Sequence, residues 1–187
     1  MTADEAVVSV LDALDTASVP YMIVGSLASN FHGIPRSTRD ADFVVELFPD
    51  SLTRLADALP ADLTLDSQAA FEAETGTTRY LVELAASPFV CELFVRSDDD
   101  AHDRERFRRR LRVRVFDRVA YVASAEDMVV TKLRWVDQAH RAKDREDIRN
   151  MLAVRGEELD WTYLRHWSKE HGTSALLEQI RDSLPPG

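Results

Sequence analysis

The sequence predicts an α/β (α+β) fold, a mixed β-sheet with flanking helices, followed by a helical C-terminal extension. Residues 21–47 contain a short apolar strand, an amphipathic helix and a second strand in close succession. The last third of the chain carries apolar residues at helical spacing. We therefore expect an α/β core over residues 1–123 and a helical domain over residues 124–187 packed on it.

Length and composition set the broad class of protein. The 187 residues are 45% hydrophobic, enough to fill a real core, and the net charge is −10. Such an acidic surface argues against non-specific nucleic-acid binding by the whole molecule. The sequence has no run of about 18 apolar residues and no apolar signal segment, so we expect a cytoplasmic protein with no membrane contact. The single cysteine, Cys91, lies in an apolar strand and is interpreted as a core residue.

Local signals place the elements along the chain. Thr2 and Glu5 form a capping box for a first helix that ends before Pro20, and Pro49 to Ser51 opens a helix that Pro60 closes. Strands are expected at residues 63–65, 79–84, 89–95, 111–115 and 119–122. The polar run 97–103 is expected to be a solvated loop. Ser124 and Asp127 cap a helix, and further helices are expected near residues 143–153, after Asp160 and after Thr173.

Two carboxylates stand at the beginning of the second strand. Asp40 and Asp42 are two residues apart, so both should point to one face while Phe43 and Val45 point into the core. Two neighbouring carboxylates repel each other unless a cation lies between them. Mg²⁺ is commonly bound by one or two carboxylates, with substrate phosphates completing its shell.

The turn after the first strand supplies the second part of the predicted site. Gly25 allows the backbone to come close to a ligand, and Ser26 opens a helix whose free N–H groups suit a phosphate. Together with Asp40 and Asp42, these residues predict a metal–nucleotide site.

Three segments follow one another before an apolar strand: Gly25-Ser26, Arg36-Ser37-Thr38-Arg39 and Asp40-Ala41-Asp42. This pattern resembles the signature of the polymerase-β-like nucleotidyltransferase superfamily. The arginine and threonine before the aspartates are most similar to the minimal bacterial branch that includes abortive-infection and toxin–antitoxin nucleotidyltransferases. The resemblance implies a nucleotidyltransferase-like fold, Mg²⁺ (or Mn²⁺) held by Asp40 and Asp42, and an NTP as substrate.

The same resemblance implies a third carboxylate on a neighbouring strand. Glu92, an acid in the middle of an apolar strand, is our candidate for a catalytic and metal-binding role, although the family usually has aspartate there. Glu83 is the alternative. A structural salt bridge would explain either residue equally simply.

The helical part extends the resemblance to about residue 154. Thr131-Lys132-Leu133 and the segment from Arg141 to Ile148 are similar to the lysine helix and the Arg-Asp-x-x-Asp helix of the toxin-like enzymes. This implies that Lys132 is a catalytic and nucleotide-binding residue supported by Asp144 and Asp147. The alternative is a solvated helix with ion pairs such as Lys143 with Asp147.

One segment, residues 104–114, is strongly basic and contains seven arginines. It could bind phosphates of an NTP or an RNA. It could equally be a strand whose charged outer face balances nearby acids. We leave both interpretations open.

These features predict a metal-dependent enzyme that moves a nucleoside monophosphate from an NTP to an acceptor hydroxyl. Asp40, Asp42 and Glu92 would hold the metal, Gly25 and Ser26 would bind the outer phosphates, and Lys132 and Arg39 would offset charge on the leaving pyrophosphate. For the acceptor we favour RNA, such as tRNA, over a protein or a small molecule, and a cognate antitoxin is a possible partner. The alternative function is a non-catalytic module of the same fold that binds an antitoxin or an RNA.

Overall fold

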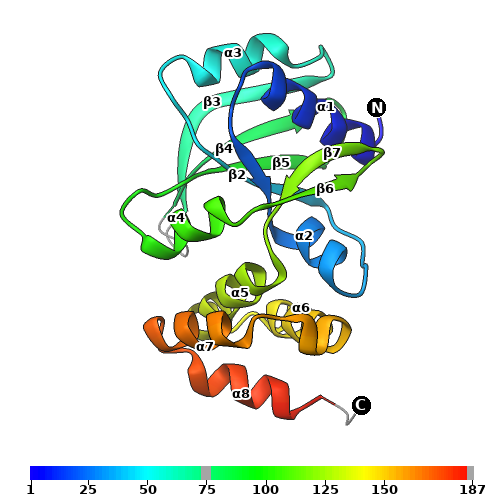
Figure 1. Cartoon of the computed structure of the whole chain (residues 1–187). Coiled ribbons are helices and arrows are strands. Elements are labelled where there is room, and N and C mark those ends of the chain that lie inside the picture. Colours follow the sequence, from blue (N-terminus) through cyan, green and yellow to red (C-terminus); the bar gives the residue numbers. More distant parts are fainter. Residues whose placement is uncertain (73–76, 185–187) are drawn as a thin grey trace. The chain divides into compact units, whose positions relative to one another are not determined.

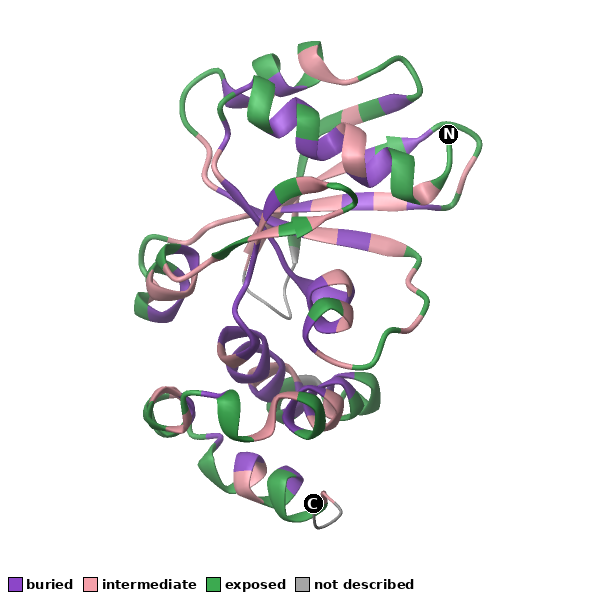
Figure 2. Ribbon diagram, turned by 45° about the vertical axis from the view of Figure 1, so that its right-hand side comes forward, coloured by how far each residue is buried: buried purple, intermediate pink, exposed green. Residues whose placement is uncertain are grey.

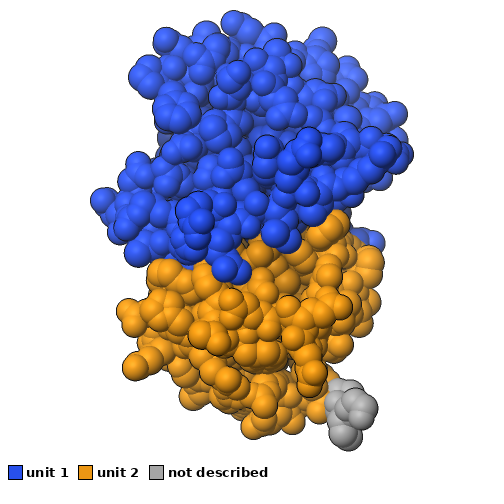
Figure 3. Space-filling model, viewed as in Figure 1, with its two compact units in different colours: residues 1–27, 37–123 blue, residues 28–36, 124–187 orange. Residues whose placement is uncertain are grey.

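The computed structural model describes residues 1–72 and 77–184, which form two compact units (Figure 3). Unit 1 consists of Met1–Leu27 and Ser37–Ala123, and unit 2 consists of Ala28–Arg36 and Ser124–Gly187. Residues 28–36, which the sequence analysis placed in the N-terminal domain, are thus grouped with the C-terminal helices.

A seven-stranded mixed sheet forms the centre of unit 1, with the strand order β3-β4-β5-β2-β1-β7-β6 (Figure 1). The strands are β1 (Tyr21–Ile23), β2 (Asp40–Val45), β3 (Leu63–Glu72), β4 (Thr77–Leu84), β5 (Val90–Val95), β6 (Leu111–Val115) and β7 (Arg118–Val122). β2 pairs with β1 antiparallel and with β5 in parallel. The predicted mixed sheet with flanking helices is therefore confirmed.

The two faces of this sheet differ in character. One face carries Ala41, Phe43, Cys91 and Leu93, all buried, and forms the core of unit 1. The buried residues of the strands are purple in Figure 2. Because side chains alternate, the opposite face carries Asp40, Asp42 and Glu92. We call this second face the carboxylate face.

Helices cover each face. α1 (Ala3–Thr16) and α3 (Ser51–Ala58) lie on the core face (Figure 1), and α1 begins with the predicted capping box of Thr2 and Glu5. Arg118 of β7 binds Asp12 and Asp15 of α1, which ties this helix to the sheet. α4 (Ala101–Arg108) lies below the sheet in Figure 1, as does α2 (Gly25–His32), which begins in unit 1 and ends in unit 2.

Two elements of unit 1 differ from the sequence prediction. The run predicted as a solvated loop contains Asp100, whose side chain accepts hydrogen bonds from the N–H groups of His102 and Asp103 and so begins α4. β3 extends from Leu63 to Glu72 and not only to Leu65, because its pairing with β4 continues past an irregularity between Asp66 and Ala70.

Unit 2 is a small helical assembly. It contains α5 (Ala125–Ala139), α6 (Ala142–Arg155), the short 3₁₀ helix η1 (Gly156–Glu158), α7 (Trp161–Glu170) and α8 (Ser174–Asp182). Their buried sides contribute Leu133, Ile148, Met151, Leu164 and Ile180. Ser124 caps α5 as expected, by accepting a hydrogen bond from the N–H of Asp127.

Among residues 1–72 and 77–184, no helix combines the length and the apolar character that crossing a membrane requires.

Candidate active site

The carboxylates of Asp40, Asp42 and Glu92 come together through strand register. Asp42 of β2 lies directly beside Glu92 of β5, and Asp40 lies beside Val90. Neighbouring strands are about 4.8 Å apart, so Glu92 projects from the carboxylate face next to Asp42. Glu83 lies on β4 opposite Val90, one strand further from β2. Of the two candidates for a third carboxylate, the sheet thus places Glu92 nearer to the aspartate pair.

Gly25 lies against the carboxylate of Asp42. It has φ = +59°, and a Cβ built on it would be 1.8 Å from Asp42 Oδ2. An L-residue is strained at this φ, and any side chain would displace the carboxylate. The first turn of α2, including the buried Ser26, therefore begins at the carboxylate pair.

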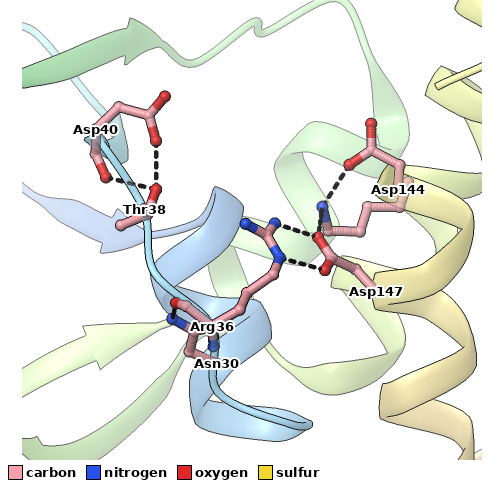
Figure 4. A network of polar contacts seen from close by, with 7 residues as sticks. Asn30, Arg36, Thr38, Asp40, Asp144 and Asp147 are labelled. Atoms are coloured by element: carbon pink, nitrogen blue, oxygen red, sulfur yellow. Dashed lines mark hydrogen bonds and ion pairs between the residues drawn. The ribbon is translucent and has the colours of Figure 1, made fainter. Parts of the chain in front are cut away.

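The carboxylate of Asp40 is held by Thr38. The hydroxyl of Thr38 lies 2.6 Å from Asp40 Oδ1 and 3.2 Å from the backbone oxygen of Asp40 (Figure 4). A hydroxyl that donates to one carboxylate oxygen orients the group and leaves the other oxygen for a cation. The sequence analysis did not assign Thr38 a role, although its position two residues before Asp40 suits such a local contact. Arg39, between them, is exposed.

Glu92 has a basic partner that the sequence did not reveal. Arg79 Nη1 of β4 donates a hydrogen bond to Glu92 Oε2 at 2.9 Å, with both side chains partly buried. Arg79 pairs with Phe94, two residues along β5 from Glu92, so the contact depends on sheet register and cannot be derived from sequence spacing. The arginine balances the charge of a carboxylate that would otherwise face Asp42.

Cys91 lies on the core face, next to this site in sequence. Burial, followed by the negative charge of Asp42, raises the pKa of the Cys91 thiol to about 12. The thiol therefore stays protonated at neutral pH, which confirms its interpretation as a core residue.

The donor set can be tested against a divalent metal. Within the described residues, no group of three or more His, Cys, Asp and Glu side chains is arranged to hold an ion by itself. Asp40 and Asp42 share one face and offer hard oxygen ligands, which suits Mg²⁺ when phosphate oxygens complete the shell. The chemistry of this donor set fits a metal that arrives with a nucleotide better than a permanently bound ion.

Lys132 belongs to a buried ion cluster within unit 2. Its Nζ lies 2.6 Å from Asp144 Oδ1 and 2.9 Å from Asp147 Oδ2, and its side chain is only 2% exposed. Arg36 binds both oxygens of Asp147, with distances of 2.8 and 2.7 Å (Figure 4). Two cations and two anions therefore balance. Asp147 pairs with Lys132 and Arg36, and not with Lys143 as the alternative interpretation proposed.

Asn30 holds the backbone of Arg36 in place. Its Nδ2 donates to the carbonyl oxygen of Arg36 at 2.7 Å, and its Oδ1 accepts from the N–H of Arg36 at 3.0 Å (Figure 4). The guanidinium is thereby presented to Asp147 by a fixed backbone. Burial raises the pKa of the Asp147 carboxyl, but hydrogen bonds and charges from Arg36 and Lys132 outweigh it and lower the pKa below its usual value.

Comparison with known proteins identifies the fold. No protein-family model and no curated protein sequence matches the chain. Solved structures do match. A solution structure of the antibiotic-resistance factor ANT(2'')-Ia has a TM-score of 0.61 at 13% identity and covers 97% of each chain. A nucleotidyltransferase-like protein from Paracoccidioides brasiliensis has a TM-score of 0.57 at 17% identity, covering 97% of this chain and 94% of the other.

A further match is a nucleotidyltransferase structure from H. pylori, with a TM-score of 0.55 at 20% identity, covering 98% of this chain and 82% of the other. The shared feature of these matches is the fold. The chain therefore has the nucleotidyltransferase-like fold that the sequence predicted. The abortive-infection and toxin–antitoxin branch stays a prediction.

Replacing Gly25 by Ala should destabilise the protein by more than the backbone strain at this φ accounts for. Strain at this φ costs about 1 kcal/mol, and the methyl group would also push against Asp42. We expect a melting temperature lowered by more than about 4 °C. Gly172→Ala is the matched control, because Gly172 has φ = +73° and open space around its Cβ position. Equal shifts of the melting temperature in the two variants would contradict the close contact.

Asp147→Asn should destabilise unit 2, since it leaves two partly or fully buried cations with one anion. Removing one partner of such a cluster costs about 3 kcal/mol. Glu178→Gln, which removes the anion of two exposed ion pairs with Arg165 and Arg181, should cost under about 1 kcal/mol. All three tryptophans lie in unit 2, so urea unfolding followed by tryptophan fluorescence reports on it.

The pH dependence follows from the lowered pKa of Asp147. The stability that its carboxylate supplies is present above the unfolded pKa of about 4 and is lost as pH falls through the lower folded pKa. The stability gap between wild type and Asp147→Asn should therefore be constant from pH 7 to about 5 and shrink towards pH 3. A gap that grows on acidification would refute this.

Proposed function

We propose that the chain is a metal-dependent nucleotidyltransferase that moves a nucleoside monophosphate from an NTP to an acceptor hydroxyl. The observation that carries the proposal is the arrangement around Asp42. Its carboxylate lies against the backbone of Gly25 at the beginning of α2 and beside Glu92 on the neighbouring strand. A cation site beside a helix N-terminus can bind a metal and a phosphate together.

Asp40 and Asp42 would hold Mg²⁺ or Mn²⁺. When bound, the metal would neutralise charge on the triphosphate and lower the pKa of the attacking hydroxyl. Thr38 would keep one oxygen of Asp40 engaged so that the other points consistently at the cation. Most of the rate enhancement would then come from positioning and electrostatics.

The remaining residues would act on the phosphates and on the proton. Backbone N–H groups at Gly25 and Ser26 would bind the outer phosphates, and the exposed Arg39 would offset their charge. The acceptor oxygen attacks the α-phosphorus, the bond to the β-phosphate oxygen breaks, and pyrophosphate leaves. Glu92 would take the hydroxyl proton or contribute to the metal site, with Arg79 holding its carboxylate.

The role of Lys132 at the phosphates stays a prediction from the family resemblance. The observed contacts support a second role, because Lys132 and Arg36 share Asp147. Arg36 is two residues before Thr38 in the chain. We propose that the cluster fixes the segment that leads to Thr38 and Asp40.

The second candidate function is a non-catalytic module that binds an antitoxin or an RNA. The Arg79–Glu92 ion pair favours it, because an arginine already occupies the carboxylate that catalysis would use. Asp40 and Asp42 favour the enzyme, since a protein that only binds has no use for two adjacent carboxylates. A toxin-like role would fit either function.

Thr38→Val should raise the Mg²⁺ concentration needed for half-maximal activity about fivefold, since the loss of one orienting hydrogen bond costs about 1 kcal/mol. Thr38→Ser keeps the donor and should restore the wild-type Mg²⁺ dependence. Measuring activity against Mg²⁺ for the three proteins separates orientation from folding. Identical Mg²⁺ curves for the Val and Ser variants would contradict the role.

The central test is transfer of label from each α-labelled NTP, with Mg²⁺, to tRNA or to the components of a cell lysate. Wild type should transfer label, and Asp40→Ala/Asp42→Ala should lose at least about 100-fold of this activity. Asp57→Ala is the control variant. It removes an exposed carboxylate from α3, the helix on the other side of the sheet from Asp40 and Asp42, and should have wild-type activity. If wild type neither transfers label nor gains thermal stability from Mn²⁺–NTP, the catalytic function is excluded and the binding module remains.

A further inference from the structure

The basic segment 104–114 divides into arginines with partners and arginines without. Five of its seven arginines, Arg109 among them, have interaction partners. Arg104 donates to the carbonyl of Asp98, Arg106 pairs with Asp103, Arg108 pairs with Glu105, and Arg110 lies over the rings of Phe107 and Tyr121. For Arg104, Arg106 and Arg108, the interpretation that the arginines balance local groups is sufficient.

Arg112 and Arg114 are different. Both lie on β6, the edge strand of the sheet, and both are exposed. Among the residues that the structure describes, neither has an ion-pair or side-chain hydrogen-bond partner. They are two residues apart, so both guanidinium groups project from the same side of the strand, roughly 6.6 Å apart at the backbone.

Register places Arg112 and Arg114 on the carboxylate face. Phe43, Ile23, Val122 and Leu111 are successive register partners from β2 to β6, and all project to the core face. The alternating residues Arg112 and Arg114 therefore project to the same face as Asp42. Arg112 pairs with Tyr121, over which the guanidinium of Arg110 lies, so a third cation adjoins the two free ones.

The distance across the sheet between β6 and β2 limits which ligands can contact both Arg112 and the aspartate pair. Three strand spacings lie between β6 and β2, so Arg112 is about 14 Å from the position of β2. A triphosphate held at Asp40 and Asp42 is too short to reach it. An extended anionic acceptor whose terminal hydroxyl lies at Asp40 and Asp42 would be long enough to contact Arg112.

Two features select the class of acceptor. A polycation such as an aminoglycoside would be repelled by three guanidinium groups. The turn between β6 and β7 carries Phe116, which is 37% exposed, and an exposed aromatic ring beside arginines offers a stacking surface for a base as well as contacts for phosphates. Outward N–H groups of an edge strand add further donors for phosphate oxygens.

We propose that Arg110, Arg112 and Arg114 form a binding surface for the phosphodiester backbone of a single-stranded RNA acceptor. This inference rests on the proposed nucleotidyl transfer and adds the acceptor class and its surface. The NTP binds at one end of the carboxylate face, and the RNA backbone runs from there towards β6. The bases contact the β6–β7 turn.

The test compares wild type with Arg112→Gln/Arg114→Gln and with Arg108→Gln. Arg108 is a matched control, because its side chain is 73% exposed but already paired with Glu105. Binding of a fluorescein-labelled 15-nucleotide single-stranded RNA is followed by anisotropy over a salt series. We expect the double variant to bind at least tenfold more weakly at low salt, with a salt slope smaller by about 1.4, which corresponds to two phosphate contacts. Arg108→Gln should bind as wild type does.

Two further measurements keep the outcomes separate. Stabilisation by Mn²⁺–NTP should be the same in wild type and the double variant, and its absence from wild type would count against the proposed function itself. If Mn²⁺–NTP stabilises the protein but RNA binding is unchanged in the double variant, the β6 surface proposal is wrong. Polyglutamate that competes as strongly as the RNA would also overturn it, because the surface would then recognise acidic protein.

Discussion

The site depends on the close approach of the Gly25 backbone to the Asp42 carboxylate. No Cβ fits between them, so this position requires glycine both for its positive φ and for the space. The contact exists because β1 and β2 are antiparallel neighbours, and because only Val24 separates the end of β1 from the beginning of α2. The beginning of a helix, whose first N–H groups have no partner within the helix itself, is thereby brought to a carboxylate pair.

The charges around this contact are arranged in a consistent way. Asp40 is oriented by Thr38 and Glu92 is paired with Arg79, so both carboxylates are held in position by neighbouring protein groups. In unit 2 the same principle appears in a more buried form, where Lys132 and Arg36 neutralise Asp144 and Asp147. Buried charges of this kind are costly unless they are paired and hydrogen-bonded, which explains why these four occur together.

Much of the fold was predictable because its signals are local. The capping box at Thr2, the cap at Ser124 and the alternation in residues 111–115 each predicted an element that the structure contains. α4 was missed because its sequence is nearly all charged, so no apolar periodicity marks it, and its cap at Asp100 was hidden among other aspartates. The continuation of β3 beyond Leu65 was missed because the residues of this segment do not themselves indicate a strand. Its extended conformation is maintained by pairing with β4.

The sequence by itself determined the elements, the aspartate pair on one face of β2 and the glycine before α2, because each depends on residues close together in the chain. It also restricted the third carboxylate to Glu92 or Glu83. Tertiary structure decided what depends on strand order and register: Glu92 beside Asp42, Arg79 on Glu92, Arg36 and Lys132 on Asp147, and Arg112 and Arg114 on the carboxylate face. Such contacts join residues up to 111 positions apart. No local pattern encodes them, because sheet pairing and helix packing are settled by the burial of the whole core.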